Sequence, residues 1–264
     1  MTDRVHVTED NHVAYVKLTR PEKRNALDVK MINAIVDAGE ALKSRKDIRV
    51  VVLSGEGPAF CAGLDLVTMP EIAKVAQSDG GLTPRTHGIS NLFQQAAMVW
   101  AELPMPVISA VHGYAFGGGF QIMLGADIRI AAPDTQFSIM ESRWGLVPDM
   151  SGFVQMRHLM PVDVIRMLTY TGEKIGADRA LGWGIVTEVN EDPLARAKEI
   201  AKVIALKNPD AMRQAKKLIT DTMLATPADV LMKESLAQQA LIGTPNQMEA
   251  VMSGMQKRKP NFKD

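Results

Sequence analysis

Two apolar runs in this 264-residue chain each lead into a turn that contains glycine. Arg49–Ser54 precedes Phe60–Leu66, and Pro106–Val111 precedes Gly113–Gln121, which reads GYAFGGGFQ. Continuous apolar runs of this length are typical of strands buried on both faces. Glycine lets the backbone approach a ligand closely, so two such turns lying side by side could direct two N–H groups at one oxygen atom.

The rest of the chain alternates strand-like and helix-like patterns before it becomes purely helical. His12–Leu18 alternates as a half-buried strand, Asp28 is a suitable N-cap for the helix after it, and Ala126–Ala131 is another apolar strand. After Ile185–Val189 the pattern is helical only. Four helices there each begin with a capping residue and a proline: Asp192-Pro193, Asn208-Pro209, Thr226-Pro227 and Thr244-Pro245. This order predicts an α/β fold followed by a helical C-terminal part.

Charge and composition argue against several classes of protein. The chain carries 30 basic and 30 acidic residues, a balance that does not favour nucleic acid as a partner. No apolar run approaches the length of a membrane span, and the five histidines show no spacing typical of metal ligands. Met1–Val7 lacks the pattern of a secretory signal, and the single cysteine, Cys61, cannot form an internal disulfide. We therefore expect a cytoplasmic protein without a metal site or a membrane partner.

Eight segments spread over nearly the whole chain carry a family resemblance. In chain order they are Arg20–Leu27, Phe60–Leu66, Pro106–Gly113, Gly117–Gly119, Ala126–Ala131, Phe137–Pro148, Thr171–Gly184 and Lys257–Phe262. Together they resemble the crotonase (enoyl-CoA hydratase/isomerase) superfamily. The resemblance implies a crotonase-like spiral of ββα turns in residues 1–195. It implies a helical region in residues 196–264 that contacts coenzyme A and assembles a homotrimer or a dimer of trimers.

The resemblance also implies a coenzyme A thioester as substrate, as in fatty acid metabolism, with no separate cofactor. Chemistry in this family proceeds through a thioester enolate held by two backbone N–H groups, which match Leu64 and Gly118 here. The spacing by itself gives only two glycine-flanked turns. One preorganised donor of this kind is typically worth about 3 kcal/mol to an oxyanion.

Typical hydratases of the family use two glutamates, and the matching positions here hold Gln121 and Glu141. Glutamine can orient a water molecule or the thioester, but it has no titratable proton and cannot act as a general acid or base. Apolar neighbours of Glu141 in the sequence would raise its pKa toward neutrality, as a proton-shuttling base requires. Asp149 matches an aspartate that dienoyl-CoA isomerases of the superfamily use beside this glutamate. It also suits a helix N-cap, so both roles stay open.

The resemblance implies four substrate-binding positions. Ala62 and Leu66 lie on the loop along which the family binds coenzyme A, and Arg24 matches a position near the pantetheine and phosphates. Lys257 matches a lysine that reaches the coenzyme A phosphate, often that of a neighbouring subunit. The polar segment Val67–Ser90 is expected to line or cover the acyl end of the pocket. Structural roles are expected for three nearby residues: Cys61, Asp65 and His112.

We therefore expect an enzyme of the enoyl-CoA hydratase/isomerase type, either an isomerase or a lyase. Double-bond isomerisation of an enoyl- or dienoyl-CoA is preferred, because one carboxylate, that of Glu141, is enough for a 1,3-proton shift. Two alternatives remain. In the first, the protein is an enoyl-CoA hydratase in which Gln121 holds a water molecule that Glu141 activates. In the second, it binds coenzyme A thioesters without catalysis.

Overall fold

The main sheet has six strands and is parallel except for its first strand. A computed structural model describes residues 3–264. In spatial order the strands of the main sheet are β1 (Val5–Asp10), β2 (Val13–Leu18), β3 (Val50–Gly55), β4 (Val107–Val111), β6 (Ile128–Ala131) and β9 (Glu188–Val189). Only β1 pairs in the antiparallel sense, with β2. The central strands are rich in Val and Ile and are buried on both faces, as expected for a parallel sheet covered by helices.

A second, three-stranded sheet consists of β5 (Tyr114–Phe116), β7 (Gln136–Ser138) and β8 (Ile175–Gly176). The chain passes from β4 to β5, and again from β6 to β7, so successive turns alternate between the two sheets. Cys61, which follows β3, forms a parallel bridge to Ala115 in β5, and Leu27 forms another to Leu64. These bridges continue the second sheet and bring the two glycine-containing turns together. The predicted ββα spiral is therefore present.

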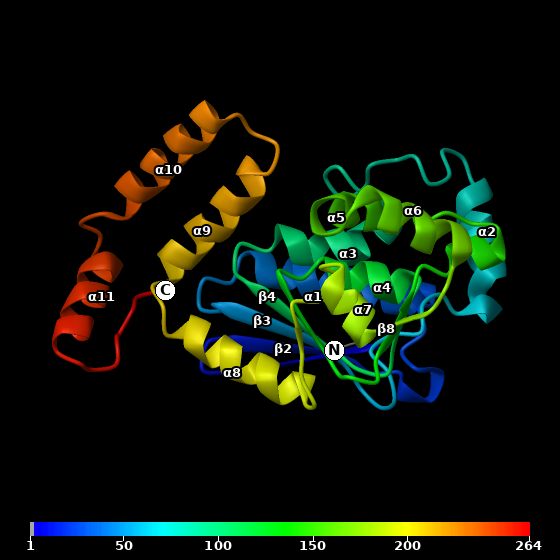
Figure 1. Cartoon of the computed structure of the whole chain (residues 1–264), viewed down its shortest axis with the longest axis horizontal. Coiled ribbons are helices and arrows are strands. Elements are labelled where there is room, and N and C mark those ends of the chain that lie inside the picture. Colours follow the sequence, from blue (N-terminus) through cyan, green and yellow to red (C-terminus); the bar gives the residue numbers. More distant parts are fainter. Residues whose placement is uncertain (1–2) are drawn as a thin grey trace.

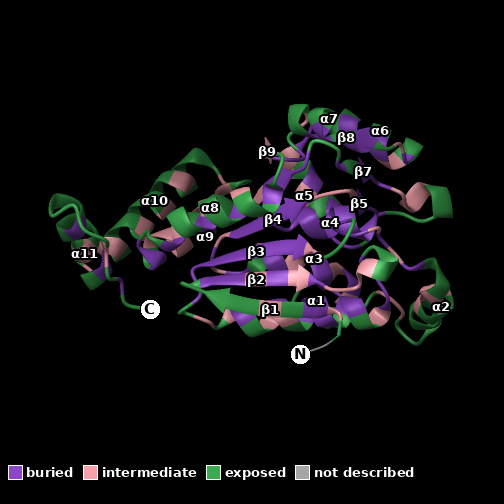
Figure 2. Ribbon diagram, turned by 90° about the horizontal axis from the view of Figure 1, so that it is seen from below, coloured by how far each residue is buried: buried purple, intermediate pink, exposed green. Residues whose placement is uncertain are grey.

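Helices cover both faces of the main sheet (Figures 1 and 2). On one face lie α1 (Val29–Lys43) and α3 (Leu92–Glu102), which also contact each other. On the other face, α8 (Pro193–Ala205) packs its alanines against β2, β3, β4 and β6. The remaining elements of the core are η1 (Pro21–Lys23), η2 (Leu66–Thr68), α2 (Met69–Gln77), α4 (Gly118–Leu124), η3 (Glu141–Trp144), α5 (Gly152–Leu159), α6 (Val162–Thr171) and α7 (Ala177–Gly182).

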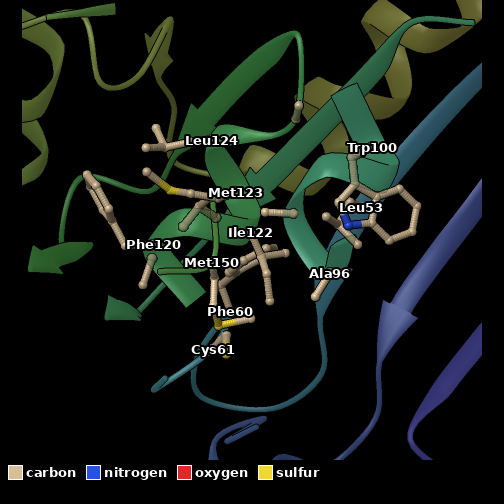
Figure 3. Close-up of a cluster of buried hydrophobic side chains, with 14 of the residues drawn as sticks. Leu53, Phe60, Cys61, Ala96, Trp100, Phe120, Ile122, Met123, Leu124 and Met150 are labelled. Carbon is tan, nitrogen blue, oxygen red and sulfur yellow. The ribbon is translucent and has the colours of Figure 1, made fainter. Parts of the chain in front are cut away.

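The core between α3, α4 and the sheet is densely packed. Figure 3 shows Trp100 of α3 near Leu53, together with Phe60, Cys61 and the α4 side chains Phe120, Ile122, Met123 and Leu124. Every residue of α4 is buried. The helix that carries Gln121 is therefore held on all sides, so the position of this side chain is fixed by the core.

Three helices extend away from the sheet at one end of the molecule: α9 (Pro209–Thr222), α10 (Pro227–Leu241) and α11 (Pro245–Met255) (Figures 1 and 2). The four predicted helix starts from α8 onward are confirmed, because each capping side chain accepts a hydrogen bond from a backbone N–H in the first turn. The expected division between residues 195 and 196 falls inside α8, which packs as one unit on the sheet. That division stays a prediction.

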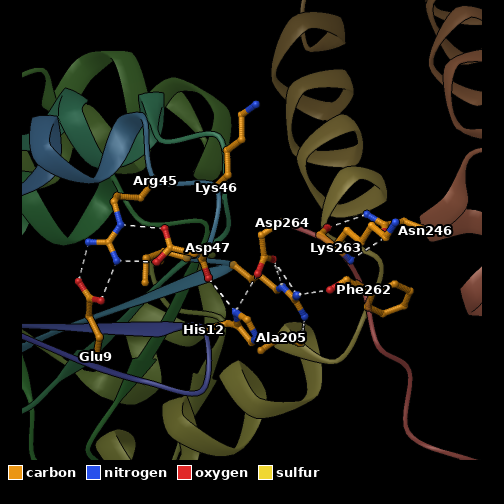
Figure 4. Close-up of polar contacts among 12 residues, drawn as sticks. Glu9, His12, Arg45, Lys46, Asp47, Ala205, Asn246, Phe262, Lys263 and Asp264 are labelled. Atoms are coloured by element: carbon orange, nitrogen blue, oxygen red, sulfur yellow. Dashed lines mark hydrogen bonds and ion pairs between the residues drawn. The ribbon is translucent and has the colours of Figure 1, made fainter.

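Polar contacts attach the C-terminal residues to the core (Figure 4). The Arg49 guanidinium lies 2.7 Å from a carboxylate oxygen of Asp264, and it also donates to the carbonyl oxygens of Ala205 and Phe262. The Asn246 amide of α11 donates to the Lys263 carbonyl oxygen, at 2.9 Å. These bonds fix the ends of α8 and α11 relative to the start of β3.

The sequence patterns missed β1 and short strands such as β5 and β8, and misplaced one helix start. β1 is followed by Asn11 and His12, which both have positive φ, and this two-residue turn is the hairpin signal that could have revealed it. We expected helix from Met150 onward, but α5 begins at Gly152. No helix among residues 3–264 is long and apolar enough to cross a membrane.

Candidate active site

A cavity of about 510 Å³ is bounded by α2 and by the segments that begin at Gly117 and Met140. Its walls are mainly apolar, with Met69, Ile72 and Ala73 of α2 among them. Two ionisable side chains, those of Glu141 and Asp149, line it. The expectation that the segment after Val67 lines a pocket is met by α2 and by Leu82.

Leu64 lines this cavity through a turn whose N–H directions can be followed from its neighbours. Leu27 donates to the Gly63 carbonyl oxygen at 2.8 Å and accepts from the Asp65 N–H at 2.9 Å, so these two groups face residue 27. Because successive N–H groups of extended chain point to opposite sides, the Leu64 N–H faces away from Leu27. It therefore faces the side on which β5 and α4 lie, and it has no backbone acceptor within residues 3–264.

Gly118 lines the same cavity as the first residue of α4. The N–H groups in the first turn of a helix have no partner within the helix. Gly118 also finds no backbone acceptor in the described part of the chain. Leu64 and Gly118 thus each present an unpaired donor at one cavity, from turns that are joined by the bridge between Cys61 and Ala115.

Asn25 holds the first of these turns in place. Its side chain is fully buried, and its amide nitrogen donates to the carbonyl oxygens of Glu56, Ala59 and Phe60. Its amide oxygen accepts the Arg20 N–H at 2.8 Å. One side chain therefore satisfies four backbone groups of the segments that lead to Leu64, which rigidifies the approach to the cavity.

Glu141 begins η3 and presents a half-satisfied carboxyl group to the cavity. Its Oε1 accepts a hydrogen bond of 2.6 Å from Nε2 of Gln121, and its Oε2 is buried with no partner in the described structure. Burial raises the pKa of Glu141 above its usual value, the Asp149 charge acts in the same direction, and the hydrogen bond from Gln121 opposes both. Arg143, two residues along, takes no part in these contacts.

Gln121 does not line the cavity. Its side chain is 1% exposed, and its Oε1 accepts the backbone N–H groups of Met150 and Gly152, both at 2.9 Å. Its Nε2 faces Glu141. Gln121 therefore contacts the Glu141 carboxylate and the turn before α5.

Asp149 lines the cavity as a solvent-exposed residue whose carboxyl group is partly shielded by the protein. Burial raises the pKa of this carboxyl above its usual value. The alternative role as the N-cap of α5 is wrong, because the capping position is Ser151 and its side chain makes no cap hydrogen bond. Its proposed part in catalysis stays a prediction.

The expected binding residues divide into two groups. Ala62 and Leu66 line the cavity, and Leu66 is exposed at its rim. Arg24 does not line it. Its guanidinium lies 5.7 Å from the centre of the Tyr114 ring. Lys257 follows α11, at the opposite end of the molecule from α2 (Figures 1 and 2). The binding roles of all four residues stay predictions.

The sequence predicts structural roles for three residues near the cavity, and their surroundings agree with this prediction. Burial raises the pKa of the Cys61 thiol to about 12, so this thiol is not an activated nucleophile. Asp65 forms an ion pair of 2.8 Å with Arg20, and the His112 ring contacts the Gly57 carbonyl oxygen at 2.8 Å. Within residues 3–264, no group of three His, Cys, Asp or Glu side chains is arranged to hold a metal ion.

Three residues at the cavity rim were not predicted from the sequence. Trp144, Leu146 and Val147 line the cavity, yet their side chains are 54%, 44% and 68% exposed. Large apolar side chains that stay exposed together often mark a place where a ligand binds. The signal was available in the sequence as an apolar cluster beside Pro148 in a segment without helical or strand periodicity.

The comparisons with known proteins identify the family. The family model described as enoyl-CoA hydratase/isomerase matches residues 8–264, so the chain belongs to this family and is one of its enzymes. A carnitinyl-CoA dehydratase from Salmonella typhi is 32% identical over 228 residues, covering 84% of this chain and 82% of that protein. Family membership implies an acyl-CoA substrate.

Solved structures agree with the fold. An enoyl-CoA hydratase from Bacillus anthracis superposes with a TM-score of 0.89 at 28% identity, covering 98% of this chain and 99% of that one. A putative enoyl-CoA hydratase/isomerase from Mycobacterium abscessus gives 0.88 at 30% identity, with coverage of 98% and 99%. The expected crotonase fold with C-terminal helices is confirmed.

Proposed function

We propose that this enzyme moves the double bond of an enoyl- or dienoyl-CoA by a proton shift, 1,3 in an enoyl chain and 1,5 in a dienoyl chain. Glu141 removes a proton from the carbon next to the thioester carbonyl, and the electron pair left on carbon delocalises onto the carbonyl oxygen. The N–H groups of Leu64 and Gly118 stabilise that oxyanion. The proton then returns two carbons away in an enoyl chain, or four carbons away in a 3,5-dienoyl chain, from Glu141 or from Asp149, so atoms and charge balance without a cofactor.

One observation carries the preference for isomerisation. The position of the second hydratase glutamate holds Gln121, whose amide oxygen is occupied by two backbone donors and whose nitrogen donates to Glu141. Water addition needs both a base for water and a proton donor for carbon, whereas a proton shift can reuse one carboxyl group. The raised pKa of Glu141 suits a group that must both take and return a proton.

Hydration or dehydration is the second candidate, because relatives and solved neighbours are described as hydratases and dehydratases. Asp149 would then assist Glu141, since both side chains line the cavity. A water molecule held by Gln121 gains no support, because the Gln121 side chain is buried away from the cavity.

We also propose an uncharged, apolar acyl chain as the substrate group. The α2 wall offers methionine, isoleucine and alanine side chains, with Gln77 as its polar contribution to the lining. Burying a chain of methylene groups there is favourable by about 0.8 kcal/mol per group, whereas a charged acyl group would lose its hydration without a partner on this wall.

A panel of thioesters tests the reaction. We expect rapid conversion of a 3-enoyl-CoA to the 2-enoyl-CoA, or of a 3,5-dienoyl-CoA to the 2,4-dienoyl-CoA, followed by absorbance and chromatography. We expect at least about 100-fold slower hydration of crotonyl-CoA, in keeping with the loss of one general acid–base group. Fast loss of the crotonyl chromophore would overturn the isomerase assignment. Absence of turnover with every thioester, despite tight binding, would favour the non-catalytic alternative.

A homotrimer or a dimer of trimers is the proposed assembly. The helices α10 and α11 stand away from the core and expose apolar side chains that one chain leaves uncovered. These side chains are Met232, Leu236, Met248, Val251, Met252 and Met255. An apolar surface of this kind is typical of an interface between subunits. Sedimentation equilibrium should give the mass of three or six chains, and the mass of a single chain would contradict the proposal.

The cytoplasm is the proposed compartment. The support is chemical: Cys61 is buried and unpaired, as expected in a reducing environment. Cell fractionation with an antibody against the protein tests this, and recovery with the secreted fraction would contradict it.

A further inference from the structure

The orientation of the Gln121 amide is fixed by its surroundings. Backbone N–H groups are donors only, so the side-chain atom that meets both Met150 and Gly152 must be the amide oxygen. The nitrogen then faces Glu141, at 2.6 Å. The three bonds agree with each other, and reversing the amide would place donor against donor at two positions.

The turn before α5 is built around this oxygen. Gly152 has no room for a side chain, because a Cβ atom there would lie 2.7 Å from Oε1 of Gln121. Ser151, between the two donors, has a φ of +65°. A non-glycine residue in this conformation is strained, and the two hydrogen bonds to Gln121 offset part of that strain.

The same amide makes the two oxygens of Glu141 unequal. Oε1 accepts from Nε2 of Gln121, whereas Oε2 is buried with no hydrogen-bond partner in residues 3–264. When the carboxyl group is protonated, the oxygen that accepts an N–H donor is favoured as the carbonyl oxygen. The proton therefore resides on Oε2.

We propose that Gln121 is a positioning residue, whose amide holds Oε1 of Glu141 and thereby fixes the orientation of this carboxyl group at the cavity. The role of Glu141 as the base rests on the proposed function, but its hydrogen bond to Gln121 does not. Glutamine performs this task better than glutamate, because a carboxylate at position 121 could accept from Met150 and Gly152 but could not donate to Glu141.

The surroundings of Glu141 allow a change in the titration of its carboxyl group to be interpreted directly. Oε1 is bonded to Gln121 and Oε2 to no residue of the described chain, so no lysine or arginine pairs with this carboxylate. Asp149, which precedes α5, is the titratable group whose charge acts on it. A change at position 121 should therefore appear directly in the titration of Glu141.

The test is a ¹³C NMR titration of the free, full-length protein labelled at glutamate side-chain carboxyl carbons, with Glu141 assigned by the loss of its signal in Glu141→Gln. In Gln121→Glu the two carboxyl groups lie within hydrogen-bond distance and must share a proton. We expect the higher apparent pKa of the pair to exceed that of Glu141 in the parent by more than about one unit. The low-pH limb of kcat/KM should move upward by the same amount.

Two further variants keep the test decisive. Gln155→Glu adds the same charge on α5, where Gln155 contacts Met98 rather than Glu141, and should leave the titration unchanged. Gln121→Met removes the donor, and should raise the pKa of Glu141 and lower stability, because the N–H groups of Met150 and Gly152 lose their acceptor.

An unchanged titration of Glu141 in folded Gln121→Glu would overturn the inference and leave Gln121 a packing residue. This readout needs no substrate. A protein that shows the expected shift but no isomerase activity would thus contradict the proposed function alone.

Discussion

Glu141→Gln is expected to lower kcat/KM for the best thioester substrate by about 10²- to 10⁴-fold, while the affinity for the thioester changes little. Glutamine has nearly the shape of glutamate, and its amide oxygen can still accept the hydrogen bond from Gln121 that Oε1 accepts now. What it cannot do is take a proton from carbon. The loss should therefore appear in kcat, with the equilibrium dissociation constant of a product thioester, measured by calorimetry, unchanged within about threefold.

The pH dependence of kcat/KM in the parent enzyme should also show that Glu141 acts as the base. The base must be ionised to act, and burial raises the pKa of Glu141 above its usual value of 4.5. The value of kcat/KM should therefore fall as the pH is lowered through that raised pKa. The low-pH limb of the kcat/KM profile should lie at a higher pH than the pKa of an ordinary exposed glutamate.

A matched control separates this effect from a general loss of charge. Glu191→Gln removes an exposed carboxylate before α8, remote from the cavity lining, and should leave kcat/KM unchanged. Activity of Glu141→Gln within tenfold of the parent enzyme would show that another group removes the proton. Asp149 would then be the first residue to test.

Gly63→Ala is expected to cost at least about 2 kcal/mol of stability and about 100-fold or more in kcat/KM. Gly63 has a φ of +86°, which an L-residue adopts only with strain, and its Cβ would lie 2.6 Å from the Phe116 carbonyl oxygen. That carbonyl belongs to the segment leading into Gly118. Relief of the clash must separate the two turns that present the Leu64 and Gly118 N–H groups.

Gly243→Ala is the control for the effect of backbone strain alone. Gly243 has a φ of +79°, but its Cβ would meet no atom within 4 Å, so only the conformational strain of about 1 kcal/mol applies. Urea denaturation of both variants should show the larger loss for Gly63→Ala, and activity should fall in that variant only. Equal losses of stability, with full activity in both, would contradict the close approach of the two turns.

Much of the fold follows from local signals in the sequence. Asp192, Asn208, Thr226 and Thr244 each place an acceptor before a proline, and each caps the helix that was predicted from it. These contacts span only a few residues, so the local sequence contains both partners. The buried strands follow in the same way from continuous apolar runs.

The arrangement at the cavity depends on contacts between distant parts of the chain, which local patterns do not contain. Gln121 is 29 residues from Met150 and 31 from Gly152, and no periodicity reveals which way its amide points. Asp149 has the residue type and the preceding proline of a helix cap, but α5 begins later because the turn wraps around the Gln121 oxygen. The resemblance to the family supplied Leu64 and Gly118, and the spacing alone supplied only the glycines.

The most direct measurement is a crystal structure of Glu141→Gln with an unreacted enoyl thioester bound. The account predicts the thioester oxygen at about 2.7–3.1 Å from the backbone nitrogens of both Leu64 and Gly118. It also predicts that the side chain at position 141 lies against the carbon from which the proton leaves. A thioester oxygen that contacts neither nitrogen, or a side chain at position 141 turned away from the acyl chain, would contradict it.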